Sequence, residues 1–278
     1  MIQKSYDDSA SLYLIPTPIG NLDDITVRSL NVLRTVDEIL CEDTRDTGLL
    51  LSHYSIQKKL VSCHEFNESK MIDYVVSKLK EGYNLGLVTD QGTPIISDPG
   101  YIVARGVIEA GYNVISLPGA TAFVPALTSS GIEPSPFLFY GFLNAKDSKQ
   151  IQELQSLKDY PFTIIFYEAV HRMKSTLNHI LDVFGDRSIC ICRELSKIHE
   201  EYTRGKITEV LPLVDQMKGE FVIVVEGNHS VTDYSSLDIV EHVQMYLDDM
   251  SEMDAIKKVA KERGVAKSVI YQEYHKRK

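Results

Sequence analysis

Four short loops concentrate glycine, proline and small polar residues, the residue types that let a backbone approach a small ligand closely. They are Pro16–Asn21, Asp90–Pro94 with its continuation to Gly100, Pro118–Ala122, and the segment that begins at Glu168. One such loop alone is better explained as a tight turn, but four together, all at strand ends, favour a binding site. None matches a GxGxxG dinucleotide loop or a phosphate-binding P-loop. The pattern therefore predicts a small-molecule site of another kind.

A second group of residues offers proton transfer and phosphate binding. The segments CEDTRDTG, HEFNE and FYEAVHR contribute Glu42, Arg45, His64 and Glu168. A carboxylate at the end of a strand can accept or orient a proton, and an arginine can hold a phosphate. Each also has a structural alternative, because Asp43 or Thr44 and Asn67 are typical helix caps and His64 can be a satisfied, partly buried histidine. We predict catalytic roles for Glu42, Arg45 and Glu168. The same segments also hold Glu65, His171 and Arg172.

Short apolar runs alternate with helical patterns along the first 120 residues. Because this alternation requires crossover connections, it predicts a largely parallel sheet with strands buried on both faces. Ligands bind such sheets beyond the carboxyl ends of the strands, where the loops above are expected. The expected strands span 12–19, 38–43, 59–64, 84–90 and 113–119, and the expected helices span 26–36, 44–53, 67–81 and 100–110.

A second set of elements begins near residue 137. Its expected strands span 137–143, 163–168, 188–195 and 220–227, and its expected helices span 148–158, 170–184 and 208–217. The stretch 129–136 is rich in Gly, Pro and Ser and is the best linker candidate. We predict an α/β class protein with an N-terminal α/β domain at 1–128, a C-terminal α/β domain at 129–234 and a helical tail at 235–278.

Composition narrows the class of protein. The formal net charge of −10 argues against a surface coated with basic residues. No apolar run approaches the roughly 20 residues of a membrane helix, and the first residues do not form a secretory signal, so a cytoplasmic protein without a membrane partner is expected. Cys190 and Cys192 alternate with isoleucines in a strand-like run, which places both sulfurs on one face. They are expected to be buried free thiols, and no metal site is predicted.

The last 44 residues separate their charges. Six acids and no Lys or Arg lie within 235–254, whereas eight bases and two acids lie within 255–278. The segments 252–263 and 266–276 read as two short helices around Gly264. One interpretation is a helical cap whose lysines are only solvated. The alternative that we favour is a helix-turn-helix-like module that docks on RNA phosphates. Its predicted RNA contacts are Lys257, Lys258, Lys261, Arg263 and Lys267.

Eight segments occur in the order of a known family. They are LYLIPTPIGNLDDIT, CEDTRDTG, HEFNE, DQGTPIISDPGY, LPGATA, FYEAVHR, CREL-K and GEFVIVVEG, over residues 12–227. The chain closely resembles the bacterial ribosomal RNA small-subunit methyltransferase I family, which are cytidine 2′-O-methyltransferases of the tetrapyrrole-methylase superfamily. Two departures are Gln91, where the family usually has Ala, and Thr89, where it often has Ser. Gln91 is expected to narrow the space beside its loop.

The resemblance implies two α/β domains of tetrapyrrole-methylase type, with S-adenosyl-L-methionine in the cleft between them, plus the helical tail. It also implies 16S rRNA of the small ribosomal subunit as the partner, and a homodimer. By correspondence with the family motifs, the cofactor-binding candidates are Pro18, Asp90, Gly92, Thr93, Pro94, Ile95, Thr121, Ala122 and Tyr167.

Two alternatives stay open at this point. A methyltransferase acting on a corrin or porphyrin precursor would share the fold and the cofactor, although that class usually carries a GxGPGD-type first loop where this chain has PTPIGN. A non-catalytic RNA-binding assembly protein would have lost the chemistry. Cofactor binding distinguishes the second alternative, and methyl transfer to small ribosomal subunits distinguishes the first.

Overall fold

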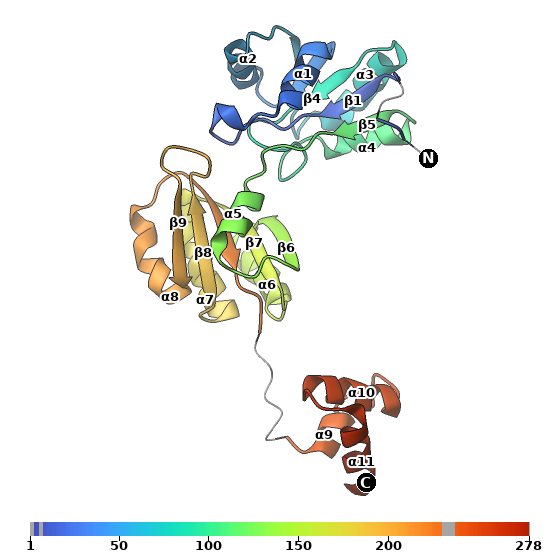
Figure 1. Ribbon diagram of the computed structural model, residues 1–278, viewed down its shortest axis with the longest axis vertical. Coiled ribbons are helices and arrows are strands. Elements are labelled where there is room, and N and C mark those ends of the chain that lie inside the picture. Colours follow the sequence, from blue (N-terminus) through green and yellow to red (C-terminus); the bar gives the residue numbers. More distant parts are fainter. Residues whose placement is uncertain (1–2, 6–7, 230–236, 278) are drawn as a thin grey trace. The chain divides into compact units, whose positions relative to one another are not determined.

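The chain forms two compact units, Met1–Asn228 and His229–Lys278 (Figure 1). The computed structural model describes residues 3–5, 8–229 and 237–277. The first unit contains two five-stranded sheets, and the second unit is helical. The expected α/β class with a helical C-terminal part is confirmed. The domain boundaries at 128 and 234 stay a prediction.

The first sheet is parallel throughout, in the order β3-β2-β4-β1-β5. Its strands are short, and β2 and β4 are fully buried, as the continuous apolar runs predict. The strands are β1 (Ser11–Leu14), β2 (Glu38–Cys41), β3 (Lys59–Ser62), β4 (Leu85–Leu87) and β5 (Asn113–Ser116).

Helices cover both faces of this sheet. On one face, α3 (Glu68–Lys80) and α4 (Tyr101–Glu109) bury Val75, Leu79, Val103 and Val107 against the strands. On the other face, α1 (Val27–Thr35) and α2 (Thr44–His53) bury Leu33 and Leu51. The short helix η1 (Leu22–Asp24) lies in the loop after β1. With both faces covered, the loops at the carboxyl ends of the strands are left to bind ligands.

The second sheet is mixed, in the order β6-β7-β10-β8-β9. Only β6 and β7 are parallel, while β10 runs antiparallel to both β7 and β8. The strands are β6 (Phe137–Phe142), β7 (Thr163–Ala169), β8 (Ser188–Arg193), β9 (Glu201–Lys206) and β10 (Glu220–Val225). Helices α6 (Asp147–Leu157), η2 (Val170–Arg172), α7 (Met173–Phe184), α8 (Ile207–Val210) and η3 (Leu211–Gln216) complete this half.

The two faces of the second sheet have different covers. Helices α6 and α7 bury Leu154, Leu177 and Ile180 on one face. On the other face, α5 (Phe123–Ser130) packs Ala126 and Leu127 against a cluster that includes Cys190 and Cys192. Both thiols are free and buried, with their sulfurs 3.7 Å apart, so the predicted same-face placement is confirmed.

The helical unit has a core of its own. Helices α9 (Ile239–Gln244), α10 (Glu252–Glu262) and α11 (Lys267–Arg277) bury Val243, Ile256, Val259, Ile270 and Tyr274 together. The two helices expected around Gly264 are present, and α9 adds a third that the sequence analysis did not include. None of the described residues belongs to a helix that could cross a membrane.

Candidate active site

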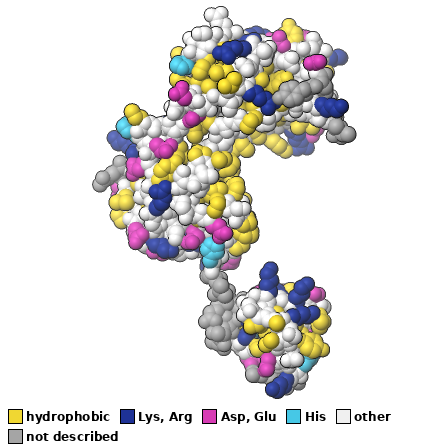
Figure 2. Space-filling model, in the orientation of Figure 1, with side chains coloured by type: hydrophobic (Ala, Val, Ile, Leu, Met, Phe, Trp, Pro, Cys, Tyr) yellow, Lys and Arg dark blue, Asp and Glu magenta, His cyan; other side chains and the backbone are white. Residues whose placement is uncertain are grey.

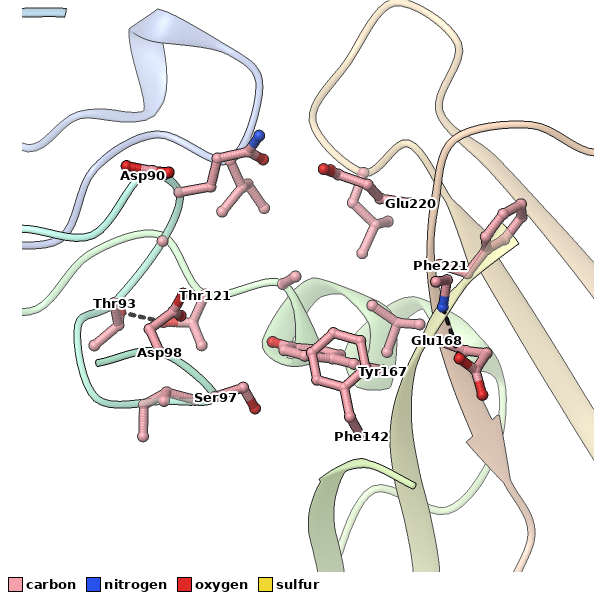
Figure 3. A pocket seen from close by; sticks show the side chains of 18 of the residues that line it. Asp90, Thr93, Ser97, Asp98, Thr121, Phe142, Tyr167, Glu168, Glu220 and Phe221 are labelled. Carbon is pink, nitrogen blue, oxygen red and sulfur yellow. Dashed lines mark hydrogen bonds between the residues drawn. The ribbon is translucent and has the colours of Figure 1, made fainter. Parts of the chain in front are cut away.

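A cavity of about 540 Å³ opens where loops of the first sheet meet the second sheet (Figure 3). Its volume lies within the range of small-molecule sites. One wall comes from the loop after β4, with Asp90, Thr93, Ser97 and Asp98, and from Thr121 after β5. The opposite wall comes from β6, β7 and β10, which present Phe142, Tyr167, Glu168, Glu220 and Phe221 (Figure 3). The site thus lies at the expected carboxyl edge of the parallel sheet.

The structure brings most of the predicted residues together in this cavity. Its lining includes Glu42, Asp90, Gly92, Thr93, Thr121, Ala122, Tyr167 and Glu168. The remaining candidates lie elsewhere. Pro18 is buried and lines a neighbouring cavity, Pro94 is buried within its loop, and Ile95 packs into the core of the first sheet. The side chain of Arg45 is 86% exposed and pairs with Asp43 at 2.6 Å.

Gly92 fixes the start of the loop that follows β4. It has φ +87° and exchanges two backbone hydrogen bonds with Thr17, of 2.9 and 3.2 Å. A Cβ at this position would lie 3.3 Å from Ile19 Cγ2 and in the left-handed region that side chains rarely adopt. The hydroxyl of Thr17 donates to the carbonyl of Thr89, which ties the loops after β1 and β4 together. Hydrogen bonds thus join the first and second predicted loops into one wall.

Three threonines hold the rest of this wall. Thr93 Oγ1 lies 2.6 Å from Thr121 Oγ1 and donates to the carbonyl of Ala120 at 3.0 Å. Thr89 Oγ1 donates to Asp98 Oδ1 at 2.9 Å. The threonine that departs from the usual family serine is thus used to orient a cavity carboxylate. Gln91, the other departure, lines both this cavity and its neighbour.

The cavity is acidic. Desolvation raises the pKa of Glu42, Asp90 and Asp98 above their ordinary values, and the negative charge of Asp90 raises the pKa of Glu42 and Asp98 further. No Lys or Arg is among the described residues that line the cavity. Carboxylates that lie close together without a positively charged side chain beside them stabilise a ligand that carries positive charge. The site therefore favours a small molecule that carries positive charge.

Glu168 and Glu42 differ sharply in their surroundings. Glu168 is buried, and its carboxylate accepts hydrogen bonds from Thr176 Oγ1 at 2.6 Å and from the backbone of Ala169 at 2.8 Å. Arg172 lies 3.3 Å from the same carboxylate. Glu42 is half-buried, and burial raises its pKa although the nearby His64 acts to lower it. Within the described residues, Nδ1 of His64 is buried without a hydrogen-bond partner.

Aromatic side chains form the wall of the second sheet. Tyr167 contacts Phe139 and Phe142 edge to face, at 4.9 and 5.6 Å between ring centroids. Its hydroxyl accepts a hydrogen bond from the backbone of Phe123, and burial raises the pKa of this phenol to about 12. The phenol therefore stays neutral and offers a flat, apolar surface to a ligand.

Several lining residues were missed by the sequence analysis. Ser97 and Asp98 lie in a loop that was selected, yet only its first residues were chosen. Glu220 and Phe221 begin β10, and they reach the cavity because β10 is antiparallel to β7. The direction of a strand in a mixed sheet does not change its hydrophobic periodicity. Only the motif GEFVIVVEG could therefore have indicated Glu220 and Phe221.

Two of the five predicted RNA contacts of the helical unit also make contacts within that unit. Lys257, Lys261 and Lys267 are exposed, and Figure 2 shows Lys and Arg side chains on the visible face of this unit. Lys258 lies over the ring of Tyr246 at 3.8 Å. Arg263 donates to His242 Nδ1 at 3.0 Å and to the carbonyl of Leu237 at 2.6 Å, which ties the end of α10 to α9.

Among the described residues, no group of three or more His, Cys, Asp or Glu side chains could hold a metal ion.

Comparison with known proteins assigns this geometry to a family. The model of the Tetrapyrrole (Corrin/Porphyrin) Methylases matches residues 11–211. The chain is 45% identical to ribosomal RNA small subunit methyltransferase I of Bacillus subtilis, over 96% of this chain and 95% of that protein. It is 38% identical to the protein of the same name from Escherichia coli O157:H7, over 97% and 96% of the two chains.

Solved structures agree on the fold. Uroporphyrin-III-C-methyltransferase from Thermus thermophilus is similar with a TM-score of 0.55 and 18% identity, over 78% of this chain and 94% of that chain. A cobalt precorrin-4 methyltransferase is similar with a TM-score of 0.56 and 14% identity, over 81% and 98%. The chain belongs to the tetrapyrrole methylases and, within them, to the ribosomal RNA small subunit methyltransferase I family.

Proposed function

We propose that this chain is an S-adenosyl-L-methionine-dependent methyltransferase that methylates the ribose 2′-hydroxyl of a cytidine in 16S rRNA of the small ribosomal subunit. The observation that carries the proposal is the acidic cavity at the carboxyl edge of the first sheet. It occurs in a chain that aligns along 96% of its length with a ribosomal RNA small subunit methyltransferase I.

The residues of the cavity fit S-adenosylmethionine. This cofactor carries a sulfonium and an ammonium group, and Glu42, Asp90 and Asp98 supply negative charge that is not neutralised by a lining Lys or Arg. The Gly92 turn brings the backbone close to a ligand, and the Tyr167 and Phe142 rings offer an apolar surface. When bound, the cofactor supplies an activated methyl group. The protein then has to orient the acceptor hydroxyl and take up its proton.

Glu42 is our candidate for the proton acceptor. A ribose hydroxyl is a weak acid, so a nearby carboxylate with a raised pKa accelerates its reaction. Glu42 lines the cavity, and desolvation and Asp90 raise its pKa. The proton of the 2′-hydroxyl would pass to a Glu42 oxygen as the 2′-oxygen takes up the methyl group.

Glu168 and Arg45 receive other roles. The Glu168 carboxylate is already bonded to Thr176 and Ala169, so we assign it to positioning the end of β7 rather than to proton transfer. Arg45 lies at the start of α2, three residues after Glu42, with its guanidinium exposed. We propose that it contacts a phosphate of the RNA.

The helical unit is proposed to dock on the RNA through Lys257, Lys258, Lys261, Arg263 and Lys267. Support comes from the concentration of bases in residues 255–278 of an otherwise acidic chain. Lysines that neutralise phosphates release counterions and make binding depend on salt. Lys258 is also exposed but lies over the ring of Tyr246, so the exposed Lys257, Lys261 and Lys267 carry the proposal.

We further propose a homodimer. The first unit leaves large apolar side chains exposed, among them Phe66, Tyr101, Ile102 and Ile108. Exposed apolar patches commonly mark interfaces between copies of a chain. Light scattering at micromolar concentration should give twice the chain mass, and a monomeric mass would contradict the proposal.

The function is tested with purified small ribosomal subunits that lack the modification. Incubation with the protein and tritiated S-adenosylmethionine should label the 16S rRNA, and mapping should place the methyl group on a cytidine 2′-oxygen. A matched reaction with a porphyrin precursor should remain unlabelled. Labelling of the precursor in place of the RNA would overturn the assignment of the substrate.

A further inference from the structure

Glu68 is a buried carboxylate that lies outside the cavity. It is the first residue of α3 and is 4% exposed. Its two oxygens accept hydrogen bonds from backbone amides of a different segment, Gly100 at 2.6 Å and Ile102 at 3.0 Å. Burial of a carboxylate is costly unless its hydrogen bonds are made, and here both oxygens are used. The charge therefore has a specific task at residues 100–102.

Those two amides belong to the start of α4. The first amides of a helix have no partner within the helix, and a capping side chain normally satisfies them. The N-cap of α4 is Gly100, which has no side chain and makes no such cap. Glu68 supplies the missing acceptor from the neighbouring helix, and its negative charge also suits the positive end of the α4 dipole.

The loop that ends at α4 is strained. Ile95 has φ +78° and Ser97 has φ +66°, although neither is glycine. Left-handed conformations of such residues persist only when the surroundings impose them. At its start, the loop is fixed by the bridge between Thr17 and Gly92. At its end, the fixed point is the pair of hydrogen bonds from Gly100 and Ile102 to Glu68.

The strained loop presents cavity residues between these two anchors. Ser97 and Asp98 lie along the cavity wall in Figure 3, and Asp98 is held by Thr89. Asn67 secures the other side of the arrangement. It accepts from the backbone of His64 and donates to the carbonyl of Ser62, which sets the turn that places Glu68.

We propose that Glu68 is a positioning residue for the methyl-donor site: it holds the strained loop 93–100 in the conformation in which Asp98 faces the bound cofactor. The inference rests on the proposed function, because it takes the cavity to be the S-adenosylmethionine site. The HEFNE segment, which does not line the cavity and has no assigned part in proton transfer, thereby has a role in cofactor binding.

The test compares Glu68→Gln with Asp73→Asn, a charge-neutralising change at an exposed position of the same helix. Loss of one charged hydrogen bond predicts that Glu68→Gln weakens S-adenosylmethionine binding about tenfold in calorimetry. The KM for the cofactor should rise in parallel, while kcat at saturating cofactor stays within about twofold, because the reacting groups are untouched. Asp73→Asn should leave affinity and KM unchanged.

A second readout needs no cofactor. In the free protein, amide hydrogen exchange of peptides covering 93–103 should accelerate in Glu68→Gln, while peptides from β2 and β10 keep their wild-type rates. A uniform acceleration along the first unit would show a general loss of stability and overturn the proposal. So would wild-type exchange at 93–103.

Thr89→Val provides a double-mutant cycle. Thr89 and Glu68 hold the same loop, so their effects on cofactor affinity should be less than additive. Strict additivity would count against a shared role. If Glu68→Gln does not fold, Glu68→Asp keeps the charge but shortens the side chain by one methylene. Wild-type affinity and exchange in that variant would overturn the proposal.

The experiments distinguish failure of the proposed function from failure of the proposed role of Glu68. If the wild-type protein binds no S-adenosylmethionine, the proposed function is wrong, and the exchange experiment still decides whether Glu68 anchors the loop. If the wild-type protein binds the cofactor and Glu68→Gln binds it equally well, the role of Glu68 is wrong and the function stands.

Discussion

The hydroxyl of Thr176 donates a 2.6 Å hydrogen bond to the carboxylate of Glu168, and both groups are buried. Thr176 in turn accepts from Gln150 at 3.0 Å, and the amide oxygen of Gln150 contacts His179. The carboxylate at the cavity wall is thus the end of a chain of hydrogen bonds that runs through the layer formed by α6 and α7. This arrangement is typical of a fixed structural anion.

Thr176→Val should therefore destabilise the protein. It leaves a buried carboxylate short of one donor, which costs about 1–3 kcal/mol of unfolding free energy. Urea denaturation measures the loss. The matched control is Ser175→Ala, which removes the exposed hydrogen bond from Ser175 to the carbonyl of Arg172 and should change stability by less than about 0.5 kcal/mol. Equal effects of the two changes would mean that Glu168 does not depend on Thr176.

Glu42→Gln should slow methyl transfer at saturating cofactor. Removal of a general base costs on the order of 10²–10⁴ in rate. Since a base works in its ionised form, wild-type activity should fall as the pH drops through the pKa of Glu42, which desolvation and Asp90 raise above its ordinary value. This acidic limb should be absent from the residual activity of Glu42→Gln.

The control for Glu42 is Glu65→Gln, at an exposed position of the HEFNE segment. Its rate should remain near wild type. Single-turnover kinetics across a pH series measures both variants. A Glu42→Gln variant with wild-type turnover would show that catalysis depends on positioning alone.

Gly92→Val should abolish S-adenosylmethionine binding while the protein stays folded. The new side chain would meet Ile19, and valine rarely adopts the left-handed backbone conformation of this position, so the loop that lines the cavity would have to shift. Gly82→Val is a matched control, because Gly82 has φ +90° and no atom within 4 Å of a Cβ. The two variants share the backbone cost, so calorimetry should separate them, with cofactor affinity retained only in Gly82→Val.

Replacing Lys257, Lys261 and Lys267 together by Ala should weaken RNA binding and its salt dependence. With about 0.7 units of logarithmic slope per phosphate on single strands, three lost contacts flatten the slope by roughly two units. The affinity for S-adenosylmethionine should not change.

The lysine prediction is measured by filter binding of small ribosomal subunits over a salt series. A triple change at Lys70, Lys80 and Lys149, which are exposed on the first unit, is the charge-matched control. An identical slope for the tail variant and the wild type would make the helical unit a structural appendage.

The first sheet could be predicted from the sequence because its central strands are buried on both faces. Continuous apolar runs such as those of β2 and β4 mark such strands, and parallel pairing places the loops after them at one edge. That reasoning alone brings Asp90, Thr93 and Thr121 to one cavity. It works because the site depends on chain order and strand direction, which the alternation of strands and helices encodes.

The second sheet could be predicted only in part. Strand β9 reads EYTRGK and is largely exposed, so no apolar run indicates it. The antiparallel direction of β10 is set by long-range packing. Because Phe221 reaches the cavity only in this strand direction, its position is set by the same packing. In the loop after β4, Ile95 has a positive φ and its side chain packs against the core. The motif alone does not indicate this conformation.

The position of β10 has a consequence for how the enzyme is made. Strands β7 and β8 have no pairing with each other, since β10 lies between them and is the last strand of the first unit to be synthesised. On the ribosome, the second sheet cannot close until residues 220–225 have emerged, although the first sheet is complete by residue 116. A nascent chain therefore has Phe142 and Tyr167 of the cavity wall well before it gains Glu220 and Phe221, which arrive only with β10.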